Sequence, residues 1–190
     1  RDISKRMSEQ QALKKIIAEE EEFTVKRTTD LDFQEEGDRL REISMARMVL
    51  VNLLSESKDI TVKGFAASED DYKEINTIFQ HPLVGSSWQF PKKKQESEYS
   101  NQIKRHSNFG ELASGILPED KVSRIDNLLS DGEIYVANIR IEKRVVGAFI
   151  YHCRSEPMVD NDILELFTKQ VGLLIARKKE EDVRASERAY

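Results

Sequence analysis

The feature that most constrains the fold is a pair of neighbouring strand patterns, "EIYVANIRI" at residues 133–141 and "VVGAFIYHC" at residues 145–153. Only the charged triplet "EKR" separates them, so the spacing predicts an antiparallel β-hairpin. Side chains alternate along a strand, so each strand offers one set of side chains to each face of a sheet. The sequence alone leaves open which set faces which side: one set of the first strand holds Tyr135, Ala137, Ile139 and Ile141, and the other holds Ile134, Val136, Asn138 and Arg140.

Helical patterns stand near both ends of the sequence. Residues 3–26 contain neither Gly nor Pro and carry a narrow apolar stripe, which predicts a helix that contacts one partner along one edge. A second helix is predicted over residues 35–57, where the dense run "MVLVNLL" indicates burial on more than one side. Residues 159–190 are also predicted to be helical, with an apolar stripe formed by Ile163, Phe167, Val171 and Leu174.

The middle of the chain alternates short strand and helix patterns. Residues 60–67, "ITVKGFAA", predict a strand, and residues 70–79, "DDYKEINTIF", predict a short helix. Pro82 and Gly85 then indicate a turn that leads into a short strand near Trp88. Residues 92–130 mix helical pieces with loops, with Pro118 at a helix start. This order predicts an α+β fold in which the first and last helices pack on one face of an antiparallel sheet.

Composition excludes several classes of protein. The net charge is −5, and no clustered positive field favours binding to nucleic acid. The uncharged runs fall far below the roughly 18 apolar residues that a membrane-spanning helix needs, so no membrane insertion is expected. A single cysteine, Cys153, excludes an internal disulfide and any multi-cysteine zinc site. It fits a reducing compartment, and we expect a cytoplasmic protein.

The hairpin and the run "DILELFTKQVGLLIARKK" that follows it resemble the GAF domain family of small-molecule and signal-relay modules. In that family a "viGvl" strand is matched here by residues 145–149, and the apolar run of the terminal helix by residues 162–175. The resemblance covers residues 30–178. It implies a central antiparallel sheet with the N- and C-terminal helices on one face and a helix-and-loop excursion that covers a pocket on the other.

Both ends of the sequence resemble parts of PAS domains. "RDISKRMSEQQAL" resembles the closing strand and exit helix of such a domain, and "VRASERAY" resembles the lead-in to a further one. The resemblance implies a connector helix over residues 1–29, a GAF domain over residues 30–178 and an exit connector helix over residues 179–190. Strings of PAS and GAF domains are typical of the sensor histidine kinases of two-component systems.

This context implies a signal-relay module whose partners are the flanking PAS and kinase domains and a second copy of the chain. The narrow stripes of the end helices predict a parallel homodimer with coiled-coil contacts. None of the three histidines lies in a helix like "SHExRTPL", and no Gly-rich loop resembles a nucleotide-binding lid. The segment is therefore not expected to be an enzyme. An enzyme of the methionine-sulfoxide-reductase type is disfavoured because it relies on several cysteines.

The resemblance implies a small-molecule ligand between the sheet and the excursion. Aromatic side chains are also the usual material of a packed core, which is the simpler explanation of each of them. The residues that we single out as candidate pocket walls are Trp88, Phe90, His106, Phe109, Tyr135, Phe149, Tyr151 and Cys153. A ligand-free structural spacer for dimerisation stays open as the alternative.

Haem is the leading cofactor candidate, because some members of the family bind tetrapyrroles and some attach them through a cysteine. Cys153 would be the anchor of such a redox or gas sensor. Adjacent residues of a strand point to opposite faces, so His152 and Cys153 cannot both reach one cofactor. An axial ligand would have to come from His106 or His81. We therefore expect no covalent haem, and Cys153 is more simply explained as a small buried residue.

Overall fold

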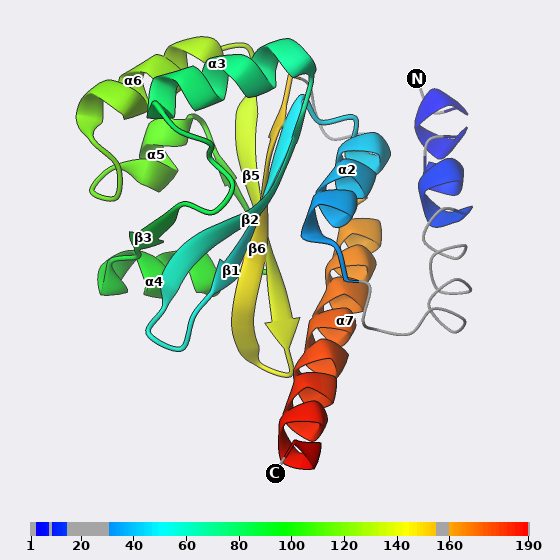
Figure 1. Ribbon diagram of the computed structural model, residues 1–190. Helices are drawn as coiled ribbons and strands as arrows, with labels where there is room; N and C mark the ends of the chain where they lie inside the picture. The colour runs from blue at the N-terminus through cyan, green and yellow to red at the C-terminus, as the bar shows by residue number, and fades with distance from the viewer. Residues whose placement is uncertain (1–2, 8, 15–30, 155–159, 190) are drawn as a thin grey trace.

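The computed structural model describes residues 3–7, 9–14, 31–154 and 160–189. Its centre is a six-stranded antiparallel sheet in the order β3-β2-β1-β6-β5-β4, with helices on both faces (Figure 1). The strands are β1 (Met48–Leu54), β2 (Asp59–Ala67), β3 (Ser87–Gln89), β4 (Ile103–His106), β5 (Glu133–Ile141) and β6 (Arg144–Cys153). The helices are α2 (Phe33–Ser44), α3 (Glu69–Phe79), α4 (Lys92–Tyr99), α5 (Phe109–Ala113), α6 (Glu119–Leu128) and α7 (Asn161–Arg188). The predicted α+β class is confirmed.

The predicted hairpin is the pair β5 and β6, which align from Glu133 opposite Cys153 to Ile141 opposite Arg144. Strand β6 also pairs with β1, so β1 lies in the middle of the sheet between β2 and β6. Short strand β3 and helices α3 and α6 also stand where the sequence predicts them. Strand β4, within the stretch expected to hold only helical pieces and loops, forms the outer edge beyond β5.

The prediction of one helix over residues 35–57 is wrong beyond Ser44. Helix α2 ends there, and Met45 takes a left-handed backbone conformation with φ of 58°. The run "MVLVNLL" then forms strand β1. A central strand is covered on both faces, so it is apolar at successive positions and lacks the alternation that marks a half-exposed strand. The prediction that this run is buried on more than one side is confirmed, and the prediction that it is helical is wrong.

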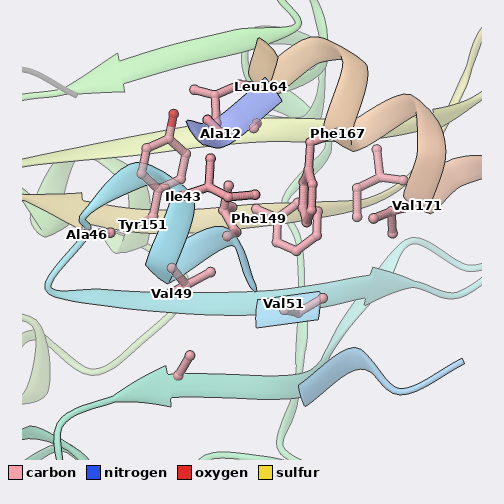
Figure 2. Packing of buried hydrophobic residues seen from close by; sticks show 14 of the residues in the cluster. Ala12, Ile43, Ala46, Val49, Val51, Phe149, Tyr151, Leu164, Phe167 and Val171 are labelled. Carbon is pink, nitrogen blue, oxygen red and sulfur yellow. The ribbon is translucent and has the colours of Figure 1, made fainter. Parts of the chain in front are cut away.

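Helices α2 and α7 cover one face of the sheet (Figure 1). Their apolar side chains pack on alternate residues of β1, β5 and β6, and the ring centres of Phe149 and Phe167 lie 5.4 Å apart (Figure 2). Gly172 lets α7 approach β5 closely, because a Cβ atom there would lie 2.5 Å from the carbonyl oxygen of Arg140. Tyr135, Ala137 and Ile139 of β5 therefore face α2 and α7, an orientation that the hairpin sequence alone left open.

The opposite face of the sheet is covered by α3, α5 and α6 (Figure 1). Ile134 and Val136 of β5 join a second apolar cluster there, together with Val62 and Phe65 of β2. The two clusters lie on opposite sides of a single sheet. The predicted arrangement, with terminal helices on one face and the excursion on the other, is therefore confirmed.

Two helical segments stand near the ends of the sequence. Residues 3–7 and 9–14 are helical, and Ala12 among them is buried in the cluster of α2 and α7. The predicted helix over residues 15–26 lies outside the described residues. Helix α7 runs past the end of the sheet, as Figure 1 shows at its red end. The stripe expected to contact a second copy is largely used within the protein, because Phe167 and Val171 are fully buried against the sheet.

Candidate functional site

A cavity of about 120 Å³ lies between the sheet and the helices α3, α5 and α6. Its floor consists of side chains of β1, β2, β5 and β6, and its cover is mostly aliphatic and aromatic. The aliphatic lining comes from residues such as Leu50, Val62 and Ile150. An apolar cavity of this kind favours a mainly apolar occupant.

Four of the candidate wall residues border this cavity, namely Trp88, Phe90, Phe109 and Tyr151. Trp88 stands in the short edge strand β3, and its ring packs against Phe79 of α3 with a centroid distance of 5.8 Å. Tyr151 borders the cavity from β6, but its ring lies in the cluster on the other face and stacks on Tyr135 at 5.4 Å.

The other four candidates lie elsewhere. Tyr135, Phe149 and Cys153 belong to the cluster under α2 and α7, across the sheet from the cavity. His106 is buried in β4 at the edge of the sheet, where it pairs with Glu98. These residues could be named from the sequence. Alternation along β5 and β6, however, places Tyr135, Phe149 and Cys153 on the face that α2 and α7 cover.

Haem anchored at Cys153 does not fit this arrangement. The thiol does not face the cavity, and burial raises its pKa to about 11, so little nucleophilic thiolate forms near neutral pH. The volume of about 120 Å³ is also small beside the roughly 300 to 1,000 Å³ of pockets that take drug-sized ligands. We therefore derive no chemistry through a haem group.

Polar atoms without partners gather at one end of the apolar cavity. Asn52 of β1 and Asn138 of β5 both stand opposite Ala148 of β6, so two amide side chains flank one small residue on the floor. Asn52 is 7 % exposed and Asn138 is fully buried, yet the Oδ1 atom of each finds no hydrogen-bond partner among the described residues. The buried hydroxyl of Tyr99, at the end of α4, likewise has none in the described part of the chain.

The orientation of the Asn138 amide follows from its donors. Its Nδ2 atom donates to the carbonyl oxygens of Glu98 and Asn101, both at 2.8 Å, so Oδ1 is the atom left over. Burial raises the pKa of the Tyr99 hydroxyl above its ordinary value, with the charge of Glu98 adding to the effect. The hydroxyl therefore stays protonated. This end of the cavity thus combines two amide groups with one hydroxyl.

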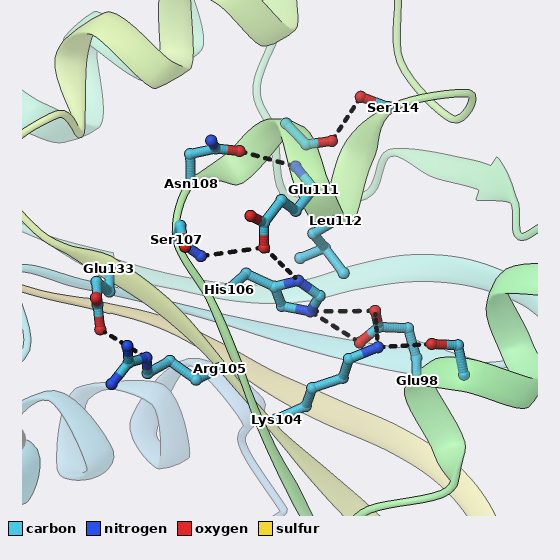
Figure 3. Close-up of polar contacts among 12 residues, drawn as sticks. Glu98, Lys104, Arg105, His106, Ser107, Asn108, Glu111, Leu112, Ser114 and Glu133 are labelled. Atoms are coloured by element: carbon cyan, nitrogen blue, oxygen red, sulfur yellow. Dashed lines mark hydrogen bonds and ion pairs between the residues drawn. The ribbon is translucent and has the colours of Figure 1, made fainter.

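Glu98 borders the same end and belongs to a paired cluster, shown in Figure 3. Its carboxylate accepts hydrogen bonds from Nε2 of His106 at 3.1 Å and from Nζ of Lys104 at 3.2 Å. Nδ1 of His106 lies 3.5 Å from a carboxylate oxygen of Glu111. Burial alone would raise the pKa of Glu98, but these contacts with His106 and Lys104 outweigh it and lower that pKa. Glu98 is therefore an ionised and already compensated group.

The other end of the cavity contains His152 of β6. Its Nε2 atom lies 3.0 Å from the carbonyl oxygen of Leu129, so this nitrogen carries the proton and donates, and Nδ1 has no partner within the described segments. Burial lowers the pKa of His152, which keeps the ring neutral. Close by, the guanidinium of Arg47 holds Asp71 of α3 through contacts of 2.8 and 2.9 Å. Arg47 thereby anchors α3 at the margin of the sheet.

Sequence reasoning missed the polar end of the cavity. The signal was present, because one asparagine interrupts each of the apolar strand runs "MVLVNLL" and "EIYVANIRI". A buried polar residue is more informative than a buried aromatic one. Over the described ranges, no group of three or more His, Cys, Asp and Glu side chains could hold a metal ion. Over the same ranges, no helix has the length and apolar character needed to cross a membrane.

Comparison with known proteins adds information on the fold. No protein-family model matches the sequence, and no curated protein matches it. Among solved structures, a match is found with the GAF domain/HD domain protein from Geobacter sulfurreducens, with a TM-score of 0.55 and 15 % sequence identity. The alignment covers 80 % of this chain and 95 % of that chain. The fold is GAF-like. At this identity the likeness concerns the fold alone.

Proposed function

We propose that this GAF-like domain is a sensory and signal-relay module in which a small molecule in the cavity changes the position or stability of helix α7. The observation that carries the proposal is that a single sheet separates the cavity from α7. The cavity lies on one face of the sheet and α7 on the other, so side chains of the same strands contact both. A change in the spacing or twist of β5 and β6 is then felt by α7.

A polar connection supports this route. The side chain of Gln102, between α4 and β4, donates through Nε2 to the carbonyl oxygen of Asn138 at 2.8 Å and to Oγ1 of Thr168 in α7 at 3.0 Å. Asn138 in turn holds the end of α4 through its own Nδ2 atom. Residues 98–102, at and after the end of α4, are thus hydrogen-bonded to Asn138 on the cavity floor and to Thr168 of α7.

An apolar connection runs beside it. Ala148 on the cavity floor is followed in β6 by Phe149, whose ring packs on Phe167 of α7 (Figure 2). Packed interiors respond to inserted volume by shifts of backbone and side chains. Occupancy above Ala148 therefore displaces the strand that supports α7.

The wider context belongs to the same proposal. The resemblance of both sequence ends to PAS domains supports a place in a sensor histidine kinase, where α7 would lead towards the next domain. Leu173 and Val183 of α7 are 58 % and 56 % exposed and offer apolar contacts to a second copy. The solved structure that shares the fold is described as a GAF domain/HD domain protein.

A second candidate is a ligand-free spacer that only connects domains. The modest volume of the cavity favours it, because small-molecule sites are usually larger. The two buried amide oxygens that lack partners among the described residues favour a ligand instead, because buried polar atoms are nearly always hydrogen-bonded.

The relay is tested without any ligand by a double-mutant cycle measured through urea unfolding. Ala148→Leu places three further carbon atoms in the cavity, and Thr168→Val removes the contact with Gln102. We expect the two substitutions to couple by about 0.5 kcal/mol or more, although the residues lie on opposite faces of the sheet. Thr168→Ser retains the hydroxyl and serves as the matched control, which should show less coupling. Additive effects of Ala148→Leu and Thr168→Val would contradict the relay.

A further inference from the structure

The cavity has a chemical asymmetry that selects its occupant. Most of its lining is apolar. Among the described residues, the unpartnered amide oxygens of Asn52 and Asn138 flank Ala148, and the unpartnered hydroxyl of Tyr99 also borders the cavity. Buried polar atoms are nearly always hydrogen-bonded, so each exception calls for a partner. Two such atoms beside one small residue indicate a polar group of a bound molecule at that place.

The positions of Asn52 and Asn138 define where that group lies. Both are paired with Ala148 on the intervening strand, so their side chains rise from the two neighbouring strands on either side of it. Neighbouring strands lie about 4.8 Å apart, which leaves a notch of roughly 10 Å between the two backbones. The methyl group of Ala148 fills little of this notch. A single polar group above Ala148 is within reach of both amides.

The free atoms also fix the hydrogen-bonding character of the occupant. Oδ1 of Asn138 is an acceptor by the assignment of its amide, because Nδ2 already donates twice. A partner for it must bring an O–H or N–H donor. The Tyr99 hydroxyl, which also borders the cavity, can both donate and accept and places no further demand on the occupant. A hydroxyl or an amide-type N–H meets these demands, and an ether or a simple ester does not.

Charge complementarity indicates a neutral molecule. Glu98 is the only ionised side chain that borders the cavity within the described residues. Lys104 already compensates its charge, and His106 donates a hydrogen bond to it. A buried ion without a counter-charge pays a large desolvation cost. Anions and cations are therefore both disfavoured at this end.

The volume limits the size of the occupant. An engineered apolar cavity of roughly 150 Å³ in another protein stays dry and binds benzene, and the cavity here is of about that size. His152, the other polar group with a free atom, lies four residues along β6 from Ala148, roughly 13 Å away at the usual rise per residue of a strand. A benzene-sized molecule reaches only one of the two ends, and the notch offers it more hydrogen-bond partners than the end at His152.

We infer that the cavity binds a small neutral molecule, mainly apolar and of roughly six to nine non-hydrogen atoms, whose one polar group donates a hydrogen bond in the notch between Asn52 and Asn138. Monocyclic phenols and short alcohols or amides belong to this class. The inference rests on the proposed function, of which it specifies the ligand.

Asn52 provides the sharpest test, because none of the hydrogen bonds found in the described part of the chain involves its side chain, and Leu has a similar size. Binding of phenol and of toluene is measured by ligand-observed NMR titration of wild type and of Asn52→Leu. The two probes have the same number of non-hydrogen atoms and differ in the O–H group. We expect wild type to prefer phenol by about fivefold or more, and Asn52→Leu to reduce that preference below about twofold. Asn127→Leu, on the exposed side of α6, is the control and should keep the preference.

Three results would overturn the inference: toluene binding wild type as tightly as phenol, Asn52→Leu retaining the full preference, or neither probe binding wild type. Benzoate and benzylamine test the requirement for neutrality, and binding of either as strong as that of phenol would also overturn it. None of these results bears on the double-mutant cycle, which uses no ligand. Failure of the ligand class is thereby distinguished from failure of the relay.

Discussion

The buried Oδ1 atoms of Asn52 and Asn138 carry a free-energy cost, because neither has a hydrogen-bond partner among the described residues. An unsatisfied buried polar group costs about 1 to 3 kcal/mol. Asn52 stands in a run of apolar residues where a leucine would complete the core, whereas Asn138 also holds the end of α4 through Nδ2. Costs of this kind are typical of sites where function rather than stability decides the residue.

Replacing Glu98 by Gln tests the compensated cluster of Figure 3. The native pKa of Glu98 lies below its ordinary value of 4.5, so its charge stabilises the fold above pH 4.5 and this contribution is lost as pH falls through the lower native value. We expect Glu98→Gln to lower the free energy of unfolding by about 1 to 3 kcal/mol at pH 7. The difference from wild type should shrink on acidification below pH 4.5.

Urea unfolding of both proteins between pH 7 and pH 3 provides the measurement. Glu96→Gln, at an exposed position of the same helix, is the control and should differ from wild type by less than about 0.5 kcal/mol at each pH. A deficit in Glu98→Gln that stays constant across this range would mean that the charge of Glu98 is not the stabilising feature.

At the scale of elements, the contact between α7 and β5 depends on Gly172. A methyl group there would lie 2.5 Å from the carbonyl oxygen of Arg140, so Gly172→Ala must push the helix away from the strand. Overpacking costs about 1 to 3 kcal/mol, which exceeds the gain of up to about 1 kcal/mol in helix propensity. We expect a net loss of stability in thermal unfolding. Lys169→Ala, one turn away and exposed, should leave stability within about 0.5 kcal/mol, and an equally stable or stabilised Gly172→Ala would refute this close packing.

Most elements of this fold follow from local patterns in the sequence. The β5–β6 hairpin alternates in period two beside a charged turn, and α3 has a serine cap with acidic residues in its first turn, so both were predictable. Strand β1 was not, because central burial removes the alternation that distinguishes a strand from a helix. The four-residue β4 is too short to show a period.

The candidate site shows a similar limit. Trp88, Phe90 and Phe109 could be named as cavity residues from the resemblance to a family, but the face taken by Phe149 and Cys153 depends on the register of the sheet. Asn52 and Asn138 come together only because β1 and β5 both pair with β6 opposite Ala148. Such a long-range pairing is not encoded in any local pattern.

At the scale of the whole molecule, one sheet separates the cavity from helix α7, which runs past the end of the sheet (Figure 1). Gln102 and the Phe149–Phe167 pair connect the two sides by polar and by apolar contacts. A relay of this kind needs no catalytic group, only two arrangements of the packed layers. Its central claim is that a change in the cavity is felt in α7.

Hydrogen–deuterium exchange of the backbone amides of α7 tests that claim most directly. Exchange is followed by mass spectrometry in wild type and in Ala148→Leu, with Lys63→Leu on an exposed position of β2 as the control. Our account predicts that filling the cavity changes exchange around Thr168, across the sheet, by about threefold or more, and that the control leaves α7 unchanged. Changes confined to α3, α5 and α6, with α7 exchanging as in wild type, would contradict it.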